Sequence, residues 1–159
     1  MQITILGVGK IKEAYLKDAI GEYLKRLKPF AKINVVEIAE EKSPAEPSLA
    51  QVKQIKEAEG ERILQAIPAG AYHIALALEG DNLSSPELAK KIDSITLNGH
   101  SQLVFTIGGS WGLGDKVLSK ADFLLSFGRM TFPHQLMRLI LAEQVYRAYK
   151  ISSGSAYHK

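Results

Sequence analysis

The sequence predicts an α/β fold, with a mostly parallel sheet and helices on both of its faces. Short apolar runs alternate along the chain with longer amphipathic segments, and the apolar runs are nearly continuous. Strands of this kind are buried on both faces, as in a parallel sheet that helices cover on both sides. Several of the runs end in glycine-containing turns, which punctuate strands and helices.

The first half of the chain contains two predicted strands and two predicted helices. In chain order we expect a strand at residues 1–8, a helix at 11–27, a strand at 33–38 and a helix at 49–67. The first helix has apolar or aromatic residues at intervals of four and ends near Pro29. Residues 40–48 are charged and contain Pro44 and Pro47, so they are predicted to form a loop.

The second half continues the alternation. Three further strands are predicted at 71–78, 102–107 and 123–127, and helices at 85–97, 114–119 and 133–151. The last helix is long and amphipathic, which suits either a core or a partner chain. With 159 residues and no long linker, the chain is expected to form one domain, 1–159.

Composition limits the classes of function. The chain has no cysteine, which excludes disulfides and thiolate nucleophiles. No apolar run approaches the roughly 20 residues that a spanning helix needs, and no signal peptide begins the chain, so we expect a cytoplasmic protein without a membrane partner. Basic residues concentrate towards both ends of the chain, which permits a polyanionic partner, although an ordinary solvated surface explains the same pattern.

Three late strands end in glycine turns, where ligands bind in open parallel sheets. These turns hold Gly80, residues 108–112 and residues 128–131. Two phosphate-binding motifs are incomplete in this chain. Lys12 replaces the third glycine of a dinucleotide fingerprint, and residues 115–117 do not complete a P-loop. The four histidines lack metal-ligand spacing, so no metal is expected.

Five segments carry a resemblance to a known family: residues 107–113 (IGGSWGL), 125–127 (LSF), 130–135 (MTFPHQ), 143–148 (EQVYRA) and the terminal YHK. With these segments, the whole chain resembles the RlmH (YbeA-like) family of SPOUT methyltransferases. The resemblance implies a homodimer whose C-terminal part forms a trefoil knot. It also implies an enzyme that uses S-adenosyl-L-methionine to methylate N3 of a pseudouridine in helix 69 of 23S rRNA, on the assembled 70S ribosome, with no DNA partner. A SPOUT methyltransferase for transfer RNA and a non-catalytic RNA- or ribosome-binding module are the alternatives.

The resemblance also implies the cofactor contacts, which are Leu76, Gly108, Phe127, Gly128, Arg129, Met130, Thr131 and Phe132. Arg129 departs from the family pattern, which puts a side-chain role in doubt and leaves a backbone role intact. Because the N3 proton must leave, a general base is expected, with His158 and Glu143 as candidates. A salt bridge between Glu143 and Arg147 is the alternative interpretation of that pair. The candidates for RNA contact are Arg138, Arg147, Lys150, Tyr157 and Lys159.

Overall fold

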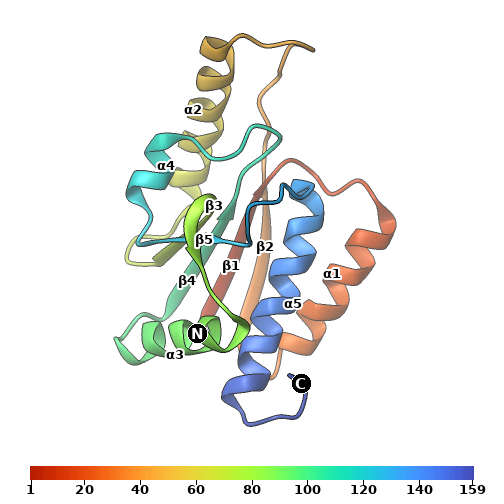
Figure 1. Ribbon diagram of the computed structural model, residues 1–159, viewed down its shortest axis with the longest axis vertical. Coiled ribbons are helices and arrows are strands. Elements are labelled where there is room, and N and C mark those ends of the chain that lie inside the picture. The colour runs from red at the N-terminus through yellow and green to blue at the C-terminus, as the bar shows by residue number, and fades with distance from the viewer.

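The computed structural model describes all residues from 1 to 159 and contains one five-stranded sheet. The strands are β1 (Gln2–Val8), β2 (Lys32–Ile38), β3 (Tyr72–Asn82), β4 (Gln102–Ile107) and β5 (Phe123–Ser126). Their order across the sheet is β2-β1-β4-β3-β5, and every pair is parallel (Figure 1). The helices are α1 (Ala14–Leu27), α2 (Leu49–Ala66), α3 (Ser85–Leu97), α4 (Asp115–Lys120) and α5 (His134–Ser152).

The sheet is buried on both faces, which explains the nearly continuous apolar runs. On β1, Ile3 and Ile5 pack in a large core that also contains residues of α1, α3 and α5. Leu6 and Val8 belong to a second core on the opposite face, together with residues of α2 and α4. Successive strand residues point to opposite faces, so each face needs its own apolar set. The predicted α/β class, with a parallel sheet covered on both sides, is confirmed.

Local signals set several element ends. Ser48 and Ser84 accept hydrogen bonds from backbone N–H groups of the first turns of α2 and α3, and each belongs to a reciprocal capping box. Two predicted boundaries differ from the structure by more than one residue. The helix α1 begins at Ala14 rather than residue 11, and β3 continues past residue 78 to Asn82. No helix of the protein is both long and apolar enough to cross a lipid bilayer.

Candidate active site

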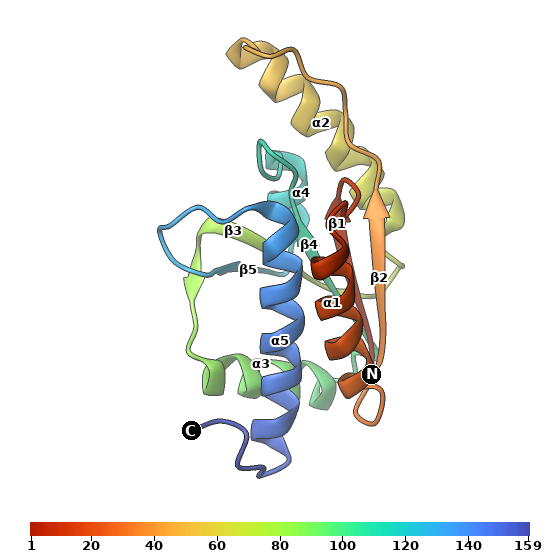
Figure 2. The ribbon, with the colours of Figure 1, turned by 90° about the vertical axis from the view of Figure 1, so that its right-hand side faces the viewer.

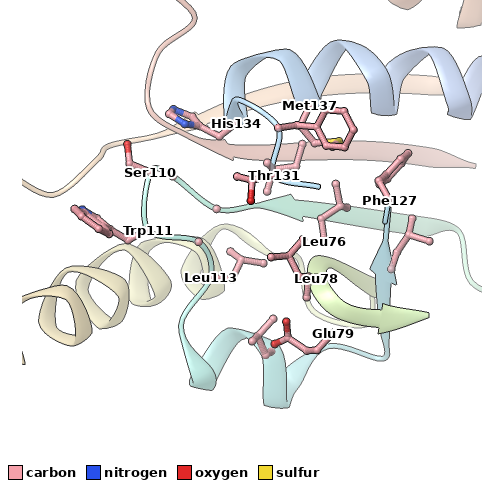
Figure 3. Close-up of a pocket in the computed structure, with 18 of the residues that line it drawn as sticks. Leu76, Leu78, Glu79, Ser110, Trp111, Leu113, Phe127, Thr131, His134 and Met137 are labelled. Atoms are coloured by element: carbon pink, nitrogen blue, oxygen red, sulfur yellow. The ribbon is translucent and has the colours of Figure 1, made fainter. Parts of the chain in front are cut away.

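Residues 76–79 of β3 and the loops that leave β4 and β5 meet around a cavity of about 830 Å³. Strand ends of a parallel sheet lie at one edge, so loops that are distant in sequence converge there. About half of the lining residues are hydrophobic. Figure 3 shows side chains from β3, from the loops after β4 and β5 and from the start of α5 around one hollow, among them Leu76, Leu78, Trp111, Thr131 and Met137.

Glycine is required at two of these loops. A Cβ atom on Gly108 would lie 2.4 Å from the backbone of Gly112, and none of these atoms can move without opening the loop. Gly128 adopts φ +116°, a conformation that residues with a side chain rarely take. Its N–H donates to Ser126 Oγ at 3.1 Å, which fixes the turn after β5. The glycines therefore let backbone groups border the cavity directly.

The structure brings together most of the residues expected to contact the cofactor. Those that line the cavity are Leu76, Gly108, Phe127, Gly128, Met130, Thr131 and Phe132. Arg129 is exposed and does not line it. Cofactor contact by these residues stays a prediction.

Several residues that line the cavity were not predicted from the sequence as site residues. They are Lys56, Leu78, Glu79, Ser110, Trp111, Asp115, His134 and Met137. Most flank the glycine turns, which was the available signal. Lys56 comes from α2, where nothing in the sequence pointed to the cavity. Burial lowers the pKa of His134, and the positive charge of Arg138 lowers it further, while Glu40 opposes both.

The C-terminal tail, residues 153–159, follows α5 and does not reach the cavity of its own chain. His134 lines the cavity, whereas Glu143 lies nine residues further along α5, about 14 Å at the helical rise of 1.5 Å per residue. The C-terminus lies near the far end of α5, away from the loop that precedes this helix (Figure 2). Within one protomer, the tail therefore does not fold over the cavity.

Glu143 instead anchors the tail to α5. Its Oε1 accepts hydrogen bonds from Arg147 Nε at 3.0 Å and from the Tyr157 hydroxyl at 3.2 Å. Arg147 Nη1 is 3.3 Å from Nδ1 of the exposed His158. The salt bridge with Arg147 is present. These contacts suit Glu143 to holding the tail in place, and its role as a general base stays a prediction.

The predicted RNA contacts divide by exposure. Lys159 is exposed, while Arg147, Lys150 and Tyr157 are partly exposed. Arg138 is fully buried, and its Nη2 donates to the carbonyls of Val8 and Gly9 at 2.6 and 2.8 Å. The prediction that Arg138 contacts an RNA phosphate is therefore wrong, because its guanidinium cannot reach the surface.

Residues 1–158 match the family model described as "Predicted SPOUT methyltransferase". The chain belongs to the SPOUT methyltransferase family. It is 57% identical to the ribosomal RNA large subunit methyltransferase H of Carboxydothermus hydrogenoformans and 55% identical to that of Bifidobacterium adolescentis, each over 100% of both chains. These matches confirm the resemblance to the RlmH family and the class of enzyme, a methyltransferase.

A solved structure supports the SPOUT fold. The structure of a probable methylase family protein from Haemophilus influenzae Rd KW20 aligns with 99% of this chain and 70% of its own, at a TM-score of 0.51 and 12% identity. At this identity the likeness concerns the fold alone. The trefoil knot expected for the C-terminal part stays a prediction.

Proposed function

We propose that this SPOUT methyltransferase transfers a methyl group from S-adenosyl-L-methionine to N3 of a pseudouridine in helix 69 of 23S rRNA, on the assembled 70S ribosome. The observation that carries the proposal is the cavity between β3 and the loops after β4 and β5, which is lined by seven of the eight residues expected to contact the cofactor. The full-length identity to relatives named ribosomal RNA large subunit methyltransferase H supports ribosomal RNA as the substrate class.

The cavity suits this cofactor in size and lining. The volume of the cavity falls within the range of about 300–1,000 Å³ that is typical of small-molecule sites. Leu76 and Phe132 offer apolar surface for an adenine ring, and the backbone around Gly108 and Gly128 offers N–H and C=O groups to its polar edge. The bound cofactor supplies an activated methyl group on a sulfonium centre.

The protein's own contribution is mainly positioning. The target nitrogen must approach the methyl group in line with the bond that breaks, so a rigid cavity that fixes this alignment accelerates the transfer. The N3 proton must leave as well, and we propose His158 as the group that receives it. His158 is exposed and far from the cavity of its own chain, so this role requires a second protomer.

We propose a cytoplasmic homodimer in which residues 1–159 form one knotted catalytic domain. In this dimer, the tail of each protomer reaches the cavity of its partner, with Glu143 as a positioning residue. Tyr157, His158 and Lys159 then stand beside the target nucleotide, and Arg147 and Lys150 lie close enough to contact its phosphates. The placement of tail and cavity at opposite ends of α5 supports this arrangement.

Methyl transfer to ribosomes tests the proposal. Labelled S-adenosyl-L-methionine would be incubated with 70S ribosomes, isolated subunits, free 23S rRNA and transfer RNA, and the products mapped by mass spectrometry. We expect methylation of a helix 69 pseudouridine, strongest on 70S ribosomes. Product on transfer RNA alone would support the transfer-RNA alternative, and ribosome binding without cofactor binding would support a non-catalytic module.

Two glycine variants connect this activity to the cavity. Gly108→Ala should abolish cofactor binding and methyl transfer, because the added Cβ collides with the backbone of Gly112 at 2.4 Å and must displace the loop. Gly21→Ala is the matched control, since a Cβ there meets nothing within 4 Å. Isothermal titration calorimetry measures the cofactor affinity of both variants. Undiminished cofactor affinity in Gly108→Ala would contradict the placement of the site.

A further inference from the structure

A second, smaller cavity of about 280 Å³ shares Ser110 and Trp111 with the candidate active site. Its other lining residues are Glu40, Glu41, Lys42 and Ser43 from the loop before α2, and Glu59 from α2 itself. Three of the seven lining side chains are carboxylates, and only one carries a positive charge. The cavity is therefore acidic, although the protein as a whole carries a net charge of +3.

Glu59 occupies an unusual position in this cavity. Only 5% of the residue is exposed, and its Oε2 accepts a hydrogen bond from the backbone N–H of Glu41 at 3.0 Å. Its Oε1 is buried and has no hydrogen-bond partner. Burying an acceptor without a donor is unfavourable, so such an atom points to a missing donor. Because Glu59 lines the cavity, a group bound there is placed to supply that donor.

The neighbouring charges do not neutralise Glu59. The guanidinium of Arg62 is engaged with the carboxylate of Glu41 and the carbonyl of Ala39. Lys42 lines the cavity and makes no salt bridge. Glu40 adds a further carboxylate without a hydrogen bond to a cation. A cation bearing N–H donors would satisfy Glu59 Oε1 and offset this negative charge.

Trp111 narrows the chemical class of that cation. The indole is 41% exposed, and it lines the cavity together with the carboxylates. An aromatic face beside carboxylates is the arrangement that binds guanidinium and alkylammonium groups, through cation–π attraction and charge-assisted hydrogen bonds. No group of three or more His, Cys, Asp or Glu side chains is placed to hold a metal ion.

We propose that this cavity, formed by Glu40, Glu41, Glu59, Ser110 and Trp111, binds a guanidinium or alkylammonium group. The group could be presented by an arginine or lysine side chain of a basic protein, or by a free polyamine. The site is distinct from the cofactor cavity but shares Ser110 and Trp111 with it, so its occupant would contact the turn that also borders the cofactor cavity. The proposal does not depend on the rRNA substrate.

The protonation of Glu59 gives the binding a predictable pH dependence. Burial raises the pKa of Glu59, and repulsion from Glu40 and Glu41 adds to the rise, whereas the backbone N–H of Glu41 and the charge of Arg62 oppose it. A bound cation favours the ionised carboxylate. Binding should therefore release protons and should strengthen as the pH rises through the pKa of Glu59.

Nuclear magnetic resonance on the full-length protein tests the proposal. Trp111 is the only tryptophan in the chain, so its indole N–H gives a single, assigned signal. Because Trp111 lines both cavities, a competition experiment with S-adenosyl-L-methionine shows which cavity the probe occupies. The probes are methylguanidinium and methylammonium, and tetramethylammonium serves as a cation that has no N–H donor. We expect saturable shifts with the first two probes and at least about tenfold weaker binding of the third, which corresponds to about 1.4 kcal/mol.

Matched variants assign the binding to Glu59. Glu59→Gln keeps the shape of the side chain and removes its charge, and it should weaken methylguanidinium binding by about tenfold or more. Glu57→Gln removes a charge from an exposed position on the same helix, where Glu57 pairs only with Lys53, and should leave binding unchanged. Glu40→Gln, at an exposed loop position, should weaken binding even if Glu59→Gln fails to fold.

The outcomes separate the proposal from its rivals. Equal affinity in Glu59→Gln and Glu57→Gln, equal binding of tetramethylammonium, or competition between methylguanidinium and S-adenosyl-L-methionine would each overturn it. The last result would mean that the small cavity is part of the cofactor site. If the proposal holds, spermidine and an arginine-containing peptide identify the source, because the natural class of occupant should bind more tightly than the compact probes.

Discussion

Arg138 places a positive charge in the interior beneath the end of β1. Its Nη2 joins the carbonyls of Val8 and Gly9, and its Nε and Nη1 are buried without partners. Burial lowers the pKa of the guanidinium, and Glu37 partly opposes this shift. The space for the side chain exists only because residue 7 is glycine, since a Cβ there would lie 2.2 Å from Arg138 Nε. Gly7 and Arg138 thus form one structural unit.

Changing either residue of this unit should destabilise the fold. Arg138→Met removes the donor to two buried carbonyls and should lower the free energy of unfolding by about 2 kcal/mol. Gly7→Ala should act in the same direction, because the new methyl group displaces the guanidinium. Urea unfolding measures both, with Gly21→Ala as a control that should gain up to about 1 kcal/mol from helix propensity. An unfolding midpoint of Arg138→Met at or above that of the unmodified protein would contradict this account.

The position of Arg138 along α5 predicts that it is buried, whereas its residue type predicts that it is exposed. It shares a face of α5 with Leu141, Val145 and Ala148, at intervals of three and four residues, and all four are buried. A lone arginine on an apolar face is ordinarily assigned to the surface, because burying a charge is unfavourable. Its acceptors are carbonyls more than 120 residues away in the sequence, which no local pattern reveals.

Tyr157 attaches the C-terminal tail to α5. Its ring meets Tyr146 edge-on with centroids 5.0 Å apart, and the guanidinium of Arg147 lies 4.9 Å from its centroid. Burial raises the pKa of Tyr157 to about 12, with contributions from Tyr23 and from the charge of Glu143. The docked tail therefore disfavours the ionised phenol.

Docking of the tail should depend on pH in the alkaline range. A free tyrosine ionises near pH 10, whereas docked Tyr157 does so near 12. The docking energy is fully present below about pH 10 and falls as the pH rises towards about 12, because only the undocked tail releases the proton. Nuclear Overhauser contacts between Tyr146 and Tyr157 measure docking. Tyr157→Phe should remove this pH dependence, and docking that persists unchanged to pH 12 in the unmodified protein would contradict it.

Helix and strand boundaries were predictable where the sequence carries explicit signals. Pro29 and the Ser48 cap bound α1 and α2 within a few residues of their predicted ends. The start of α1 was placed too early, because the N–H of Ile11 is held by the carboxylate of Glu37 on the neighbouring strand. The extension of β3 depends on a register shift against β5 between Leu76 and Asp81, which is a tertiary feature.

The molecule as a whole determines which loops share a site. The glycine turns after β4 and β5 were predicted from the sequence, whereas Gly80, expected in a third turn, lies inside β3. The convergence of these segments depends on the order β2-β1-β4-β3-β5, in which β3 lies between β4 and β5. Pairing of strands that are distant in sequence decides this order. The same limit applies to Lys56 and Glu59, which α2 brings beside the loop that follows β4.

The tail and the cavity lie at opposite ends of α5, so dimers that combine two inactive variants should regain part of the activity. Gly108→Ala disables the cavity and His158→Ala disables the tail, so each variant alone should be inactive in methyl transfer. After unfolding and refolding an equal mixture, half of the dimers combine the two variants, and each of these has one complete site. Activity should return to about one quarter of the unmodified level in a two-fold symmetric dimer. A mixture as inactive as its components would mean that the tail does not act on the cavity of the partner.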